Sequence, residues 1–181
     1  LAIAFIQLTH VVHRAARSFI KWQPLRPVVG GCIVLLLVFV SGTRDYLGLS
    51  THLAESAFAG AVGVAVGAFA WKLVFTSVSL GTGFIGGEMV PLFIIGALAG
   101  AQTGRLLNAS IPLFAAIGMM ATFAAASNTP IACIVIGVEL FGDGAMIPLA
   151  LVCVVAYSLS GQRGIYHSQK HTLITRSPRF K

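Results

Sequence analysis

The stretch GTGFIGGEMVP, at residues 81–91, decides the fold of this chain. Its four glycines permit backbone conformations that do not continue a helix, although apolar sequence flanks it on both sides. Pro91 suits the first turn of a new helix, which we predict over residues 91–107. Amides at a helix start have no partner within the helix and lie at the positive end of its dipole. The amides of Glu88 and Met89 are therefore predicted to form an anion site.

The composition around this segment is that of a membrane protein. Hydrophobic residues make up 57% of the 181 residues and charged residues 9%, whereas soluble domains carry about 25% charged residues. This balance excludes an ordinary soluble enzyme and a disordered chain. Three cysteines cannot all pair, which excludes a disulfide scaffold. The remaining class is an all-α integral membrane protein that crosses the membrane several times.

The apolar segments are short for membrane helices. A helix needs about 20 residues to cross the hydrocarbon core, and the ends of shorter helices must be buried in protein or line a cavity. Discontinuous helices of this kind form ion sites in transporters. We predict one transmembrane helical unit over residues 1–160 and a short helical, basic tail over 161–181. The helical segments are expected at 1–20, 28–41, 53–80, 91–107, 111–126, 130–141 and 145–160.

The basic residues indicate the orientation in the membrane. The chain has 12 Lys and Arg against five Asp and Glu, a net charge of +7. The basic residues gather in short connections between helices. This predicts that these connections lie in the cytoplasm and that the protein sits in the inner or plasma membrane. Aromatic residues do not alternate with them, so nucleic acid is not an expected partner. The two clusters are Arg14, Arg17, Lys21 and Arg26, and then Arg163, Lys170, Arg176, Arg179 and Lys181.

Glu88 is the acidic residue of the central segment, which contains no Lys or Arg. A carboxylate at membrane depth is costly and marks a functional site by default. Burial favours its neutral form, and a group that alternates between neutral and charged can carry protons. We therefore predict a role for Glu88 in proton coupling. The alternative is a glutamate that faces water at the membrane surface.

The remaining sequence motifs are weak evidence for a cofactor or metal site. Gly81, Gly83 and Gly86 spell G-x-G-x-x-G, but a dinucleotide site requires a preceding strand within a βαβ unit. His10 and His13 share a helix face without a nearby carboxylate, which is weak support for a metal. We expect neither a cofactor nor a metal, and no catalytic residues.

Three segments, in this order, resemble the hallmarks of the CLC chloride channel and transporter family. GFIGGEMVP and the small-residue helix after it resemble the family's GxFxP segment. AAASNTPIACIVIGVEL resembles the helix that begins at a proline and ends in a glutamate. GQRGIYHS resembles the stretch that delivers the central tyrosine, here Tyr166. Together they cover about residues 75–170.

The resemblance implies a bundle of short, tilted and broken helices that forms the second of two inverted repeats. The first repeat, with its Gly-Ser-Gly anion contact and gating glutamate, is not found here and is an expected partner. The resemblance also implies a homodimer in the lipid bilayer, with the 130–160 helices near the subunit boundary. It assigns the halide site to the segment around Glu88 and to the tyrosine hydroxyl, that is, to Gly86, Gly87, Glu88, Met89, Val90 and Tyr166.

The identity of residue 88 also indicates which anion is transported. Most chloride-transporting members carry an apolar residue there and a Phe where Met89 stands, whereas the fluoride/proton antiporter branch carries a Glu after paired glycines. That branch often has a Thr near Val90, which is missing here. We therefore expect CLC-type transport of chloride or fluoride in exchange for protons, with fluoride favoured. The alternatives are a passive chloride channel, a structural membrane subunit that transports nothing, and an unrelated transporter that binds a cation at Glu88.

Overall fold

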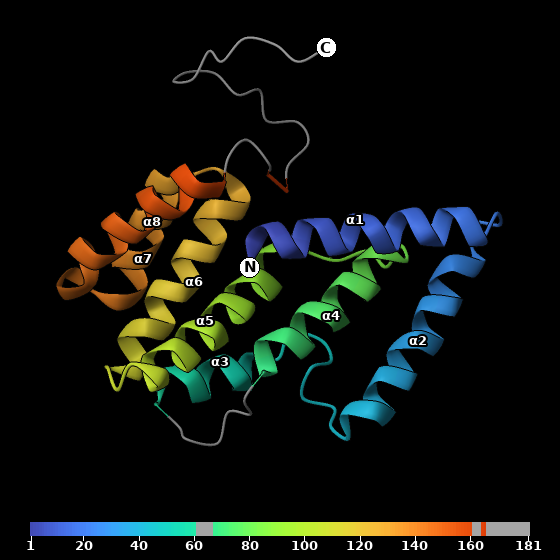
Figure 1. The fold of residues 1–181 in the computed structure, drawn as a ribbon, viewed down its shortest axis with the longest axis horizontal. Helices are drawn as coiled ribbons and strands as arrows, with labels where there is room; N and C mark the ends of the chain where they lie inside the picture. The colour runs from blue at the N-terminus through green and yellow to red at the C-terminus, as the bar shows by residue number, and fades with distance from the viewer. Residues whose placement is uncertain (61–66, 161–163, 166–181) are drawn as a thin grey trace, which may run out of the picture.

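The computed structural model describes residues 1–60, 67–160 and 164–165, and in these ranges it contains helices and no strand. This agrees with the predicted all-helical class. Figure 1 shows the helices in chain order. They are α1 Ala2–Phe19, α2 Leu25–Ser41, α3 Thr51–Phe58, α4 Ala68–Gly81, α5 Met89–Leu106, α6 Ile111–Ser127, α7 Pro130–Phe141, the short 3₁₀ helix η1 Asp143–Ala145 and α8 Met146–Ser160.

Two helices, α5 and α6, form the centre of the bundle and run side by side (Figure 1). The pair α7 and α8 packs on the far side of α6, and α3 packs against both α5 and α6. On the other side α4 contacts α5, while α1 and α2 pack against α4. The start of α5 thus lies where helices from both halves of the chain meet.

Glycines allow α5 and α6 to approach each other closely. Gly96 and Gly100 lie one turn apart on α5 and face Gly118 of α6. A Cβ atom built at Gly96 would lie 2.5 Å from the Gly118 carbonyl oxygen, closer than real Cβ contacts. Small residues at this spacing are typical of helix packing in membranes, because backbone-to-backbone contact replaces side-chain interdigitation.

The helix ends follow the local sequence signals. Gly83, at φ +100°, ends α4 in a Schellman motif, with Phe84 N donating to Ser79 O at 3.2 Å. Thr129 is the N-cap of α7, and the bounds Pro130–Phe141 are those predicted for this helix. The expected continuous segment over 53–80 is wrong, because α3 ends at Phe58 and α4 begins at Ala68 after Gly67 with φ +89°.

The predicted shortness of the helices is confirmed. Within the described ranges, Met89–Leu106 and Asp143–Ser160 are long and apolar enough to cross a membrane, by length and composition. Four further apolar helices have between 10 and 17 residues. Large apolar side chains are exposed along α2, α7 and α8, as lipid or protein contacts require; Phe39 is 88% exposed and Ile131 is 77% exposed.

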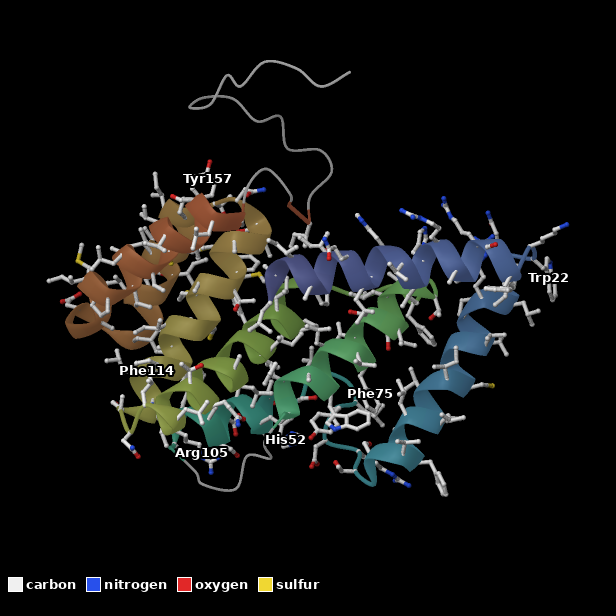
Figure 2. The ribbon with its side chains drawn as sticks, in the orientation of Figure 1. Trp22, His52, Phe75, Arg105, Phe114 and Tyr157 are labelled. Atoms are coloured by element: carbon white, nitrogen blue, oxygen red, sulfur yellow. The ribbon has the colours of Figure 1, made fainter. Side chains whose placement is uncertain are left out.

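The first basic cluster lies on an outer face of α1 and the turn after it. Arg14, Arg17 and Lys21 are exposed, and Figure 2 shows nitrogen-bearing side chains along this face up to Trp22. An exposed basic face beside an apolar bundle fits a position at the membrane surface. The second basic cluster and the expected tail over 161–181 lie outside the described residues, apart from 164–165.

Candidate anion and proton site

At the start of α5 the backbone donors lie one residue later than predicted, because the helix begins at Met89 and not near Pro91. Glu88 is the N-cap, and its carbonyl oxygen accepts the Leu92 amide at 3.2 Å. Pro91 has no N–H group, so two backbone donors remain in the first turn, on Met89 and Val90. In the part of the chain that the structure describes, neither amide has a hydrogen-bond acceptor. These two donors and the helix dipole favour an anion at this position.

The half-buried Glu88 lines a cavity of about 350 Å³ between α1, the end of α4 and the 82–88 connection. α1 contributes Thr9, His10 and His13 to the wall. His13 Nδ1 is 3.2 Å from the carbonyl oxygen of Gly81. Thr9 Oγ1 is buried and has no hydrogen-bond partner within the described ranges. The cavity therefore combines a carboxyl group, two imidazoles and a hydroxyl, which are groups able to bind or pass protons.

The end of the chain's described part reaches the same cavity. Ile165 lines it, and the Ile165 amide donates to Ala126 O at the end of α6 at 2.9 Å. Tyr166, the predicted hydroxyl donor, is the next residue and lies outside the described residues. The other predicted anion-site residues, Gly86 through Val90, are consecutive: Gly86 to Glu88 precede α5, and Met89 and Val90 begin it.

A second cavity, of about 210 Å³, lies along α4 on the other side of the same connection. Gly86 and Gly87 line it, and Gly86 lines the Glu88 cavity as well. Its wall also contains Lys72. The residues around Gly86 therefore separate two cavities, one with the acid Glu88 and one with a base.

Lys72 is buried, with 1% of its surface exposed. Its ammonium group donates to Gly48 O at 2.6 Å, Ser50 Oγ at 2.8 Å and Tyr46 O at 3.2 Å. Lys72 is not among the site residues predicted from the sequence. A signal was present, because it is the one Lys or Arg within the apolar stretch 53–80. Its burial beside Gly86, however, depends on the packing of α4 against the 42–50 connection.

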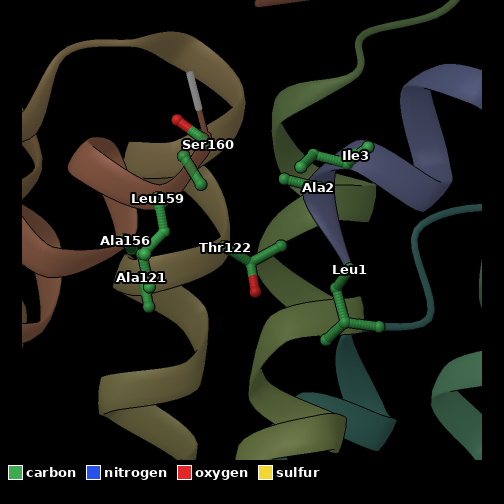
Figure 3. A pocket seen from close by; sticks show the side chains of 9 residues that line it. Leu1, Ala2, Ile3, Ala121, Thr122, Ala156, Leu159 and Ser160 are labelled. Carbon is green, nitrogen blue, oxygen red and sulfur yellow. The ribbon is translucent and has the colours of Figure 1, made fainter. Parts of the chain in front are cut away.

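A third cavity, of about 250 Å³, lies between the start of α1 and the helices α6 and α8. Figure 3 shows that its walls are small and aliphatic side chains with the hydroxyls of Thr122 and Ser160. None of the described residues that line it is acidic or basic. Groups of three or more His, Cys, Asp or Glu able to hold a metal are also absent from the described part of the chain.

The start of α5 is only partly enclosed by this chain. Met89 is 37% exposed and Val90 38%, while the side chain of Ile85 is fully exposed. Beyond this first turn the helix is buried, as at Leu92 and Ile95. The expectation that the N-terminus of this helix lies inside protein stays a prediction, which requires a further protein surface against Ile85.

The comparisons with known proteins agree with this architecture. The family model described as voltage gated chloride channel matches residues 1–161. The chain belongs to the CLC family. A chloride/fluoride channel protein of Pseudomonas syringae pv. tomato is 38% identical over 172 residues, which are 93% of this chain and 38% of that protein. An H⁺/Cl⁻ exchange transporter of Vibrio vulnificus is 30% identical over 81% of this chain and 33% of its own length.

A solved CLC structure also matches the fold. The crystal structure of a CLC-type fluoride/proton antiporter superposes with a TM-score of 0.84 at 30% identity, over 92% of this chain and 42% of that one. The predicted resemblance to the CLC family and its fluoride branch is confirmed. This CLC chain spans about two fifths of the length of the relatives it matches. Because this chain belongs to a channel family and contains apolar helices, it is an integral membrane protein.

Proposed function

We propose that the full protein moves halide anions across the membrane in exchange for protons, with fluoride as the preferred anion. One observation carries this proposal: a half-buried carboxyl group stands at the start of α5 beside two backbone amides that have no acceptor among the described residues. The amides offer fixed dipoles to a dehydrated anion, so the ion is held without a full positive charge in contact and can leave again. Glu88 supplies the group that takes up and releases the proton.

Exchange is favoured over passive conduction by the surroundings of Glu88. A channel needs no titratable group in the pathway, whereas this carboxyl lines a cavity together with His10 and His13. Two similar proteins are named as exchangers, one of chloride and one of fluoride, for protons. The fluoride preference rests on Gly86-Gly87-Glu88 and on the likeness to the fluoride/proton antiporter. Val90, in place of a threonine, remains a departure from that branch.

A flux assay on the full-length protein in liposomes tests the function. With fluoride inside, we expect fluoride efflux accompanied by proton uptake, and slower efflux of chloride under the same gradient. An ion-selective electrode and a pH dye, read together, give the two fluxes. Anion efflux without proton movement would identify a passive channel, and the absence of both fluxes would favour a structural subunit.

Tyr166→Phe tests the predicted hydroxyl donor. The variant keeps the ring and should fold normally, but it removes one hydrogen bond to the anion, worth about 0.5–1.5 kcal/mol. We expect weaker halide binding by calorimetry, or fewer protons per anion in the flux assay. Tyr157→Phe, on α8, is a matched control, since Tyr157 is not among the residues that line the Glu88 cavity. Binding and coupling equal to wild type would remove Tyr166 from the site.

The assembly and orientation are proposals as well. The inverted repeat preceding this one would cover the exposed start of α5, and α7 and α8 would lie near the boundary of a homodimer. Exposed apolar side chains such as Ile131 and Ile147 support a lipid or protein contact for these helices. The basic face of α1 supports a cytoplasmic position for the end of α1, in the inner or plasma membrane.

A further inference from the structure

Lys72 carries a buried charge without a carboxylate partner in the described part of the chain. Its three hydrogen-bond acceptors are two carbonyl oxygens and a hydroxyl, all of them neutral. The nearest acid along the 42–50 connection, Asp45, faces His52 at 3.5 Å, and both of these side chains are more than half exposed. A buried charge is costly unless it is paired, and in a membrane protein such a residue indicates an ion pathway by default.

The cavity beside Lys72 leads to the start of α5. Thr76 and Ser79 continue its wall along α4 toward Gly86 and Gly87. None of the described residues that line it is acidic. The cavity therefore joins a positive charge to the glycine segment that precedes the amides of Met89 and Val90.

We propose that this cavity is a second halide station, in which Lys72 supplies the positive charge that the backbone amides at the start of α5 do not carry. This inference rests on the proposed function and deepens it. The Glu88 cavity and the Lys72 cavity meet at Gly86, so an anion passing the start of α5 moves between a titratable acid and a fixed base. Because Lys72 holds its position through the 46–50 backbone, its charge stays in place while the anion comes and goes.

The geometry also defines how Lys72 acts. All three ammonium protons have acceptors in the 46–50 segment. The halide therefore experiences the charge through space rather than through a hydrogen bond. Such a field raises the local concentration of any small anion. The station thus adds affinity for fluoride and chloride alike, and the choice between them is made at the start of α5.

The test measures halide binding to the purified full-length protein by calorimetry, with sodium fluoride and sodium chloride as the probes. Lys72→Met should raise the dissociation constants of both halides about tenfold, the scale of one unit charge acting through space at a partly buried site, and leave their ratio unchanged. Lys72→Arg keeps the charge and should bind within about threefold of wild type. Ser50→Ala removes one acceptor of Lys72 but no charge, so it should lower the melting temperature and leave binding unchanged.

A second pair of variants leaves Lys72 in place, for the case that Lys72→Met does not fold. Thr76 is buried and lies one turn after Lys72 on the same wall of the cavity. Thr76→Asp adds a carboxylate to the cavity one helical turn from Lys72 and should weaken the binding of both halides as Lys72→Met does. Thr76→Asn has the same size as Thr76→Asp without the charge and should weaken halide binding much less than Thr76→Asp does.

If Lys72→Met and Thr76→Asp both bind halides as tightly as wild type does, the proposal of a second halide station is wrong. Lys72 then only anchors the 46–50 segment. Equal weakening by Thr76→Asp and Thr76→Asn would overturn the proposal too, since shape and not charge would then matter. A wild-type protein that neither binds nor moves halide would instead contradict the proposed function itself. The two failures are therefore distinguishable.

Discussion

Glu88→Gln is expected to reduce proton movement by about 100-fold, the lower range for loss of a proton-transferring side chain. Glutamine keeps the size of the side chain and most of its hydrogen bonding but does not titrate between pH 4 and 9, roughly the range in which buried carboxyl groups do. Insertion and assembly should be unchanged. The measurement is proton flux into liposomes driven by a fluoride gradient, with anion efflux recorded in the same sample.

The anion flux and the pH profile of this variant separate the alternatives. Anion efflux either stops, which indicates obligatory exchange, or continues without protons, which indicates an uncoupled pathway. Wild-type transport should vary with pH over a range in which Glu88→Gln does not. Glu55→Gln, an exposed glutamate on α3, is the matched control and should transport like wild type. Identical pH profiles for wild type and Glu88→Gln would show that Glu88 is a structural residue.

Gly100→Ala is expected to destabilise the protein by about 1–3 kcal/mol, the usual cost of overpacking a close contact. The added methyl group would fall on the backbone carbonyl of Phe114, which cannot rotate away as a side chain can. Figure 2 shows Phe114 on α6, beside α5. Alanine has a helix propensity up to about 1 kcal/mol better than glycine, but the clash forces α6 away from α5 and outweighs this gain.

Gly144→Ala is the control for this substitution. A methyl group at Gly144 would meet no atom within 4 Å, so its effect should stay within about 0.5 kcal/mol. Unfolding of the detergent-solubilised full-length protein, followed by circular dichroism, compares the two variants with wild type. If Gly100→Ala melts at or above the wild-type temperature, the close contact between α5 and α6 does not hold as described.

Helix ends were predictable where a local signal sets them. Pro130 begins α7 because its fixed backbone angle suits a first helical turn and no amide is lost there. The glycines of 81–91 end one helix and precede the next, because only glycine adopts the positive φ of Gly83 without strain. The segment 53–80 was not predictable in this way. It is mainly apolar and contains no proline, whereas Gly67 turns the backbone before α4.

For the candidate site, too, some features were predictable from the sequence and others were not. The sequence by itself determined the membrane class, the irregular segment at Gly86-Gly87 and the acid at Glu88, because composition and glycine placement act on the chain locally. Only the tertiary structure decided that His10 on α1 shares a cavity with Glu88 and that Lys72 lies buried beside Gly86. These residues are 78 and 14 positions away from their neighbours at the site. Their proximity results from the packing of α1 and the 42–50 connection against α4, and no local pattern encodes it.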